Sequence, residues 1–171
     1  TVSVSTTDDD VAGFTVSETE GSTTVTEAGS TDILNVVLNA QPDSDVVLSI
    51  TSSDTGEATV TSSLTFTSAN WDTAQVVTVT GVDDDLIDGT ISSNLLIAIV
   101  DASSDNNFDA VADQTVSVST TDDDVAGFTV SETEGSTTVT EAGSTDILNV
   151  VLNAQPDSDV VLSITSSDTG E

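Results

Sequence analysis

The chain repeats itself without a single change. The segment from Thr1 to Glu57 recurs from Thr115 to Glu171, so the period, from Thr1 to Thr115, is 114 residues. That period is too long for one coil of a solenoid and matches a whole domain of about 100–150 residues. It predicts tandem folded modules: 1–10 as the last strand of a preceding repeat, 11–124 as a complete repeat, and 125–171 as the first half of an identical following repeat.

Within one repeat, apolar and polar residues alternate with a period of two, which is typical of strands with one buried face. Val77 and Val79, for example, alternate with Thr78 and Thr80. Pro42 blocks continuation of the strand before it. The pattern predicts about seven short strands per repeat, and hence an all-β fold of tandem Ig-like antiparallel β-sandwich modules. The clearest strand segments are Leu34–Asn39, Asp45–Thr51, Ser63–Thr67, Gln75–Gly81, Leu95–Val100 and Thr115–Thr120.

The charge composition excludes most enzyme and nucleic-acid functions. The chain has 31 acidic residues and no lysine, arginine, histidine or cysteine, for a formal charge of −31. It therefore lacks an imidazole base, a thiol nucleophile, a Schiff-base lysine and an arginine clamp, and we expect no enzyme activity. Phosphate backbones and anionic membranes attract cations that this chain lacks, and no apolar run approaches the length of a membrane span. We therefore expect no nucleic-acid partner and no membrane insertion.

Aspartates gather in three short clusters, at Asp8–Asp10, Asp83–Asp88 and Asp122–Asp124. Each cluster directly follows a predicted strand, and strands that alternate in direction bring several of their ends to one pole of a sandwich. Adjacent carboxylates repel one another, and Ca²⁺, which binds about six to eight oxygens, relieves that repulsion. Mg²⁺ prefers to keep its waters, and Zn²⁺ favours nitrogen or sulfur ligands. The clusters thus predict calcium binding; the alternative is a solvated acidic face that keeps the protein soluble.

Several motifs of one repeat together resemble the Calx-β repeat. In chain order they are DDDVAGFTVSETEG, VTEAGST, SSDTGEATV, SLTFTSANWDTAQVVTVTGVDDDLIDG and TVSVSTTDDD. The stretch NWDTAQVVTVTGVDDD is especially similar to the Calx-β-type repeats of very large bacterial surface adhesins. The resemblance spans the region from Val11 to Asp124, and it implies an Ig-like sandwich whose calcium ions lie at one end, next to the following domain.

The resemblance also implies a set of calcium ligands. In the family these are a Glu that opens an early strand, an Asp before the fourth strand, an acidic loop after the middle strand and a terminal acidic triplet. Better-studied members have more glutamates after the acidic loop, where this chain has Asp88, Gly89 and Thr90, so the number of ions is not predicted. The corresponding residues are Glu27, Asp54, Asp83, Asp84, Asp85, Asp88, Asp122, Asp123 and Asp124, with Asp8, Asp9, Asp10, Glu141 and Asp168 in the partial copies.

Other residues have more than one interpretation. Trp71 fits either an exposed ligand platform or the edge of the core, and we predict the core. The aspartates of the segment 101–109 fit either turn caps or a further ion site, and turn capping is favoured. The remaining aromatic side chains of the repeat are expected in the core: Phe14, Phe66 and Phe108.

Together these features predict a calcium-rigidified extender module of a long extracellular adhesin or surface filament on the bacterial cell surface. Calcium would clamp the strand-end loops and the joints between modules, and the partners would be neighbouring identical repeats in the same chain or filament. The distal adhesion ligand is not predicted. One alternative is a calcium-responsive protein- or glycan-binding module, and another is halophilic adaptation, in which acidity serves solvation alone. The half repeat at 125–171 fits either a window on a continuous array or a module that other chains complete.

Overall fold

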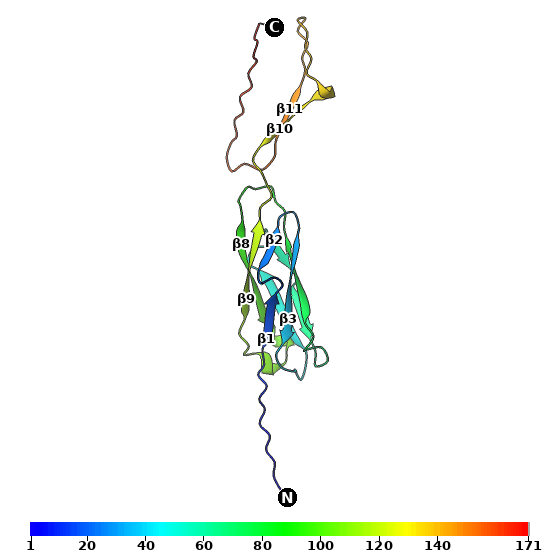
Figure 1. The fold of residues 1–171 in the computed structure, drawn as a ribbon, viewed down its shortest axis with the longest axis vertical. Coiled ribbons are helices and arrows are strands. Elements are labelled where there is room, and N and C mark those ends of the chain that lie inside the picture. Colours follow the sequence, from blue (N-terminus) through cyan, green and yellow to red (C-terminus); the bar gives the residue numbers. More distant parts are fainter. Residues whose placement is uncertain (171) are drawn as a thin grey trace. The chain divides into compact units, whose positions relative to one another are not determined.

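The computed structural model describes residues 1–170, and the chain divides into two compact units (Figure 1). Unit 1 comprises Thr1–Asp84 and Gly89–Asp122, and unit 2 comprises Asp85–Asp88 and Asp123–Glu171. The helices among the described residues are single 3₁₀ turns, and none is long or apolar enough to cross a membrane.

Two sheets form the sandwich of unit 1. The first has the order β1-β3-β7-β5, with β1 at Phe14–Glu18, β3 at Thr31–Leu38, β7 at Gln75–Gly81 and β5 at Ala58–Val60. The second has the order β2-β9-β8-β4-β6, with β2 at Thr23–Thr26, β9 at Gln114–Thr121, β8 at Ile91–Ile99, β4 at Val46–Ser52 and β6 at Ser63–Phe66. Neighbouring strands are antiparallel, except that β2 and β9 are parallel. The predicted all-β, Ig-like sandwich is confirmed.

The core of unit 1 lies between the inner faces of these sheets. In β7, Val77 and Val79 are fully buried, whereas Val76 on the other face is exposed. Burial of such side chains contributes about 25 cal/mol for each Å² of apolar surface removed from water. Trp71 is partly buried against this core, as predicted. The three expected core aromatics are also part of it: Phe14, Phe66 and Phe108.

Two single 3₁₀ turns, η1 (Asp101–Ser103) and η2 (Asn106–Phe108), connect β8 to β9. Asp105 accepts hydrogen bonds from the backbone N–H groups of Asn107 at 2.9 Å, Ser44 at 3.1 Å and Asp43. These bonds, led by the one from Asn107, hold the pKa of Asp105 below its ordinary value although burial raises it. Asp105 is therefore a turn cap, as the sequence predicted.

The amino-terminal segment differs from the expectation of a strand at 1–10. Residues 1–12 form no strand among the described residues, although the sequence Thr1–Thr7 is identical to Thr115–Thr121, which lies in β9. In the sheet, β9 occupies the edge of β8 that β4 leaves open, and β2 covers the other edge of β9. Only one copy of this sequence can therefore take that place in unit 1. The division of the chain into repeats stays a prediction.

Unit 2 contains one β-hairpin whose sequence also occurs in unit 1 as β1 and β3. β10 (Phe128–Glu132) pairs with β11 (Leu148–Leu152) in an antiparallel hairpin, and the single turn η3 (Thr133–Gly135) follows β10. The backbone N–H of Gln155 donates a 2.7 Å hydrogen bond to the carbonyl of Asp85, and Gln155 forms a parallel bridge with Leu86. The hydrophobic side chains of this hairpin are largely exposed.

Candidate metal centre

Glu27 directly follows β2 and is held beside the end of β9. Its backbone N–H donates a 3.1 Å hydrogen bond to the carbonyl of Thr121, the last residue of β9. The turn after it closes through a 3.1 Å bond from the Gly29 N–H to the Thr26 carbonyl, and Gly29 has a φ of 81°, which favours glycine. The Glu27 side chain is only 1% exposed. A glutamate at a strand end is thus folded inwards.

Glu57 directly precedes β5 and is held beside the ends of β7 and β9. Its carbonyl accepts a 2.9 Å bond from the N–H of Val82, the residue after β7, and a 3.4 Å bond from the Thr120 hydroxyl in β9. The side chain of Glu57 is 7% exposed. Two buried glutamates therefore lie where the ends of strands from both sheets converge.

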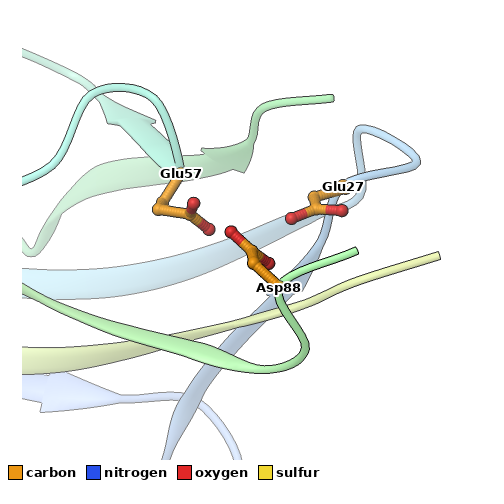
Figure 2. Close-up of side chains that lie close together, drawn as sticks. All are labelled: Glu27, Glu57 and Asp88. Atoms are coloured by element: carbon orange, nitrogen blue, oxygen red, sulfur yellow. The ribbon is translucent and has the colours of Figure 1, made fainter. Parts of the chain in front are cut away.

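The two glutamates lie close to each other. A carboxylate oxygen of Glu27 lies within 4.8 Å of one of Glu57, and an oxygen of Asp88 completes the group at the same spacing. Figure 2 shows the three side chains turned toward one another. Asp88 is exposed and immediately precedes Gly89, the residue at which unit 1 resumes.

Asp122 joins Glu27 in a second group. The Glu27, Asp122 and Asp124 carboxylates each offer an oxygen within 4.8 Å of the others. Asp122 directly follows β9, and its Oδ2 also accepts a 2.8 Å hydrogen bond from the Gly89 N–H, which ties the start of β8 to the end of β9. Glu27 belongs to both groups and is the residue around which the acids gather.

This set of side chains fits a hard divalent cation. Burial disfavours the charged form of a carboxyl group, and a second carboxylate nearby disfavours it further. The sequence offers no lysine, arginine or histidine to supply positive charge. All side-chain ligand atoms in the two groups are carboxylate oxygens, which suit Ca²⁺. Neither group offers the nitrogen or sulfur ligands that Zn²⁺ favours. Ca²⁺ binds about six to eight oxygen atoms, and carboxylates that each supply one or two oxygens can provide most of them.

The other candidate ligands of unit 1 and of the loops around it lie outside the two groups. Asp54 is exposed, and its Oδ1 accepts a 3.0 Å hydrogen bond from the Gly56 N–H, so it closes a turn. Asp84 is half-buried. The remaining candidates of this part of the chain are exposed: Asp8, Asp9, Asp10, Asp83, Asp85 and Asp123.

The partial second copy does not reproduce the site among the described residues. Glu141, the counterpart of Glu27, and Asp168, the counterpart of Asp54, are both exposed. The counterpart of Glu57 is Glu171, which lies outside the described residues. The sequence is the same, but in unit 1 the strands that bury Glu27 and Glu57 come from the other half of the repeat.

Glu57 is the member of the site that sequence analysis did not select. The motif SDTGE directed attention to Asp54, three residues earlier. A signal was present: Glu57 borders a strand, as Glu27 does in VTEAG. Its burial, however, depends on β5 pairing with β7, and β5 is too short to be recognised from its alternation.

Unit 1 is thus an Ig-like β-sandwich with an acidic pole. No protein-family model and no curated protein matches the sequence. Among solved structures it is similar to the apo-form Calx CBD1 domain, with 15% identity, a TM-score of 0.49, and coverage of 67% of this chain and 100% of that one. It is also similar to PapD-like domain 7 of human CEP192, with 10% identity, a TM-score of 0.48, and coverage of 73% of this chain and 94% of that one. A third similar structure is SSP-19, an MSP-domain protein like family member of Caenorhabditis elegans, with 19% identity, a TM-score of 0.39, and coverage of 59% of this chain and 92% of that one. At these values the likenesses carry no argument about function, and the fold assignment rests on the strand order above.

Proposed function

We propose that this chain is a calcium-binding structural module without enzyme activity, used as an extender in a long extracellular repeat protein of the bacterial cell surface. Its partners are neighbouring identical repeats. The observation that carries the proposal is the burial of Glu27 and Glu57, with carboxylate oxygens within 4.8 Å of each other, in a chain that has no cationic side chain. The resemblance of the sequence motifs to Calx-β-type adhesin repeats supports the extracellular setting.

Calcium binding would stabilise the module by linking its loops. Glu27 follows β2, Glu57 precedes β5 and Asp122 follows β9, so cations bound in the two groups that share Glu27 would link three strand ends. A ligand that binds only the folded state stabilises it by about 4 kcal/mol at a thousandfold excess over its Kd. The acidic triplet Asp122–Asp124 directly precedes the following copy of the repeat in the sequence, and we propose that calcium bound to it also stiffens the joint between modules.

Thermal unfolding of the full chain tests the proposal. We expect millimolar calcium to raise the Tm by about 10–20 °C over chelator at equal ionic strength, and magnesium to raise it much less. An unchanged transition would mean that the acidic pole is only a solvated surface.

The repeat supplies a matched control for the site itself. Glu27→Gln and Glu57→Gln should each remove most of the calcium-dependent rise in Tm. Glu141→Gln changes the same sequence context in the second copy, where the side chain is exposed, and should retain the rise. Equal effects of Glu27→Gln and Glu141→Gln would refute the assignment of the site to Glu27.

Small-angle scattering separates an extender from a calcium-responsive switch. An extender should keep the dimensions of its folded modules on calcium binding, with narrower variation in the distance between them. A switch would instead show a large change of dimensions while the modules remain folded, which circular dichroism monitors in the same samples.

A further inference from the structure

The acidic loop after β7 ends in the dipeptide Asp88–Gly89, which is the one Asp-Gly pair in the sequence. The nitrogen that follows an aspartate can close a five-membered ring with the side-chain carboxyl carbon. Glycine permits this best, because it has no side chain to crowd the nitrogen. Asp88 is exposed, and at Gly89, whose φ is 76°, no atom beyond the neighbouring residues lies within 4 Å of the position that a Cβ would take. The surroundings of the dipeptide therefore leave room for the ring.

Asp122 contacts the nitrogen that would close this ring. Its Oδ2 accepts a 2.8 Å hydrogen bond from the Gly89 N–H, and the residue directly follows β9, which holds the carboxylate in place. A general base must lie about 2.6–3.2 Å from the atom whose proton it removes. An amide nitrogen attacks a carbonyl carbon as its proton leaves, so a carboxylate at this distance assists the attack. Folding thus brings to the dipeptide a base from 33 residues further along the chain.

Asp43–Ser44 has only part of this arrangement. The Ser44 N–H also donates to a carboxylate, that of Asp105, at 3.1 Å. Ser44, however, carries a side chain next to the nitrogen that would attack, and the Asp105 carboxylate also accepts hydrogen bonds from the backbone N–H groups of Asn107 and Asp43. The chain therefore contains an internal comparison for Asp88, in which the carboxylate is present and the glycine is not.

We propose that Asp88 is a site of spontaneous modification, at which aspartate converts to isoaspartate with Asp122 as the general base. The Gly89 nitrogen forms a bond to Cγ of Asp88, and its proton passes to the Asp122 carboxylate. The Asp88 carboxyl group, in its acid form, loses its hydroxyl, which takes up that proton and leaves as water. Water then adds to the resulting succinimide. Breaking the new bond between nitrogen and Cγ restores aspartate, whereas breaking the original peptide bond gives isoaspartate of unchanged mass.

The product changes the acidic pole. Isoaspartate adds one carbon to the backbone and attaches its free carboxylate directly to Cα, so the carboxylate of residue 88 leaves its place beside those of Glu27 and Glu57 (Figure 2). This consequence, unlike the isomerisation itself, rests on the proposed calcium function. The aged chain should show a smaller calcium-dependent rise in Tm than the fresh chain. An unchanged rise would overturn this consequence and remove Asp88 from the ion site, whereas the isomerisation is measured without calcium.

The test ages the full chain at physiological pH and temperature in chelator, with enough sodium chloride to keep it folded by circular dichroism. Endoproteinase Asp-N cleaves before aspartate but not before isoaspartate, so loss of cleavage before residue 88 measures the product. Cleavage before Asp43 should persist. In concentrated urea, which separates Asp122 from Gly89, the modification should be slower by at least roughly tenfold, because a positioned general base contributes about 100-fold or more. A rate in the folded chain no faster than the rate in urea overturns the proposal.

Two variants of equal charge, at opposite ends of β9, test the role of Asp122. Asp122→Asn keeps an oxygen that can accept the Gly89 N–H but removes the base, so it should slow the modification of the folded chain by at least roughly tenfold. Asp113→Asn removes the same charge from the exposed residue before β9 and should keep the wild-type rate. In urea all three chains should react equally. Equal rates for folded wild type and Asp122→Asn, or equal slowing in Asp113→Asn, overturn the proposal.

Discussion

At Gly81, the last residue of β7, the backbone leaves no room for a side chain. A Cβ built there would collide with the carbonyl oxygen of Thr26, the residue before Glu27. Gly81→Ala must therefore displace the end of β2 and Glu27 with it. We expect it to cost about 1–3 kcal/mol of unfolding free energy. We also expect calcium binding, measured by titration calorimetry, to weaken by roughly tenfold, which corresponds to about 1.4 kcal/mol.

Gly13→Ala is the control for this substitution. Its added Cβ would lie 2.9 Å from the side-chain amide of Asn39, near the opposite end of β3, and a side chain can move aside. This variant should bind calcium as the wild type does. Wild-type affinity in Gly81→Ala would show that the close approach of β7 to Thr26 does not position Glu27.

Asp32, in β3, determines part of the dependence of stability on pH. Burial raises the pKa of Asp32, but hydrogen bonds from the backbone of Thr24 and Ile33 and from the Thr19 hydroxyl outweigh it, so the pKa lies below its ordinary value. Such a carboxyl stabilises the folded state above its unfolded pKa of about 3.9, and this contribution is lost as the pH falls through the lower folded pKa. Between about pH 5 and pH 2, the wild type should therefore lose more unfolding free energy than Asp32→Asn. Urea denaturation at several pH values measures this, and parallel curves would contradict it.

At the scale of single strands, the two copies allow a substitution to be tested in two environments. Leu34 in β3 is fully buried and its counterpart Leu148 in β11 is 43% exposed. We expect Leu34→Ala to cost about 2–5 kcal/mol in the unfolding of unit 1, through lost burial and a cavity. Leu148→Ala should leave that transition unchanged, since unit 2 lacks the covering strands. Denaturant unfolding followed by the fluorescence of Trp71, which lies in unit 1, measures both.

The same comparison explains which elements the sequence could predict. β7 begins and ends at the predicted residues, because its alternation of valine and threonine is unbroken over Gln75–Gly81. The short strands β2 and β5 were not identified, because they depend on pairing with distant strands. The copy of the β2 sequence in unit 2 shows this dependence on pairing, because the same residues form no strand there. No local pattern can assign a strand whose formation depends on its partner.

The residues of the candidate site also divide into those that the sequence could predict and one that it could not. Asp122 could be predicted because aspartate clusters at strand ends are visible in the sequence, and Glu27 was implied by the resemblance of VTEAG to a ligand motif of the Calx-β repeat. The inclusion of Glu57 could not be predicted, because its backbone is held by hydrogen bonds from Val82 and Thr120, which are distant in the sequence. Position along the chain thus predicts which strand ends are acidic, and tertiary pairing determines which acids turn inward.

At the scale of the whole molecule, a charge of −31 without one cationic side chain must be offset by ions from solution. Two mechanisms are available, and they differ in selectivity. Diffuse screening depends only on ionic strength, because the Debye length falls from about 10 Å at 0.1 M salt to about 3 Å at 1 M. Binding at the acidic pole depends on the valence, size and ligand preference of the cation. Buried glutamates such as Glu27, at 1% exposure, are poorly reached by diffuse screening.

We therefore expect molar sodium chloride in chelator to raise the Tm only modestly, and millimolar calcium at low ionic strength to raise it further. The comparison is made on the full chain by differential scanning calorimetry, with Glu27→Gln run beside the wild type. In the variant, the response to sodium chloride should persist, because most of the surface charge remains, while the response to calcium should largely disappear. If molar sodium chloride reproduced the whole effect of calcium in both proteins, the acidity would serve solvation alone, as in a halophilic protein, and the buried carboxylates would have no specific ion.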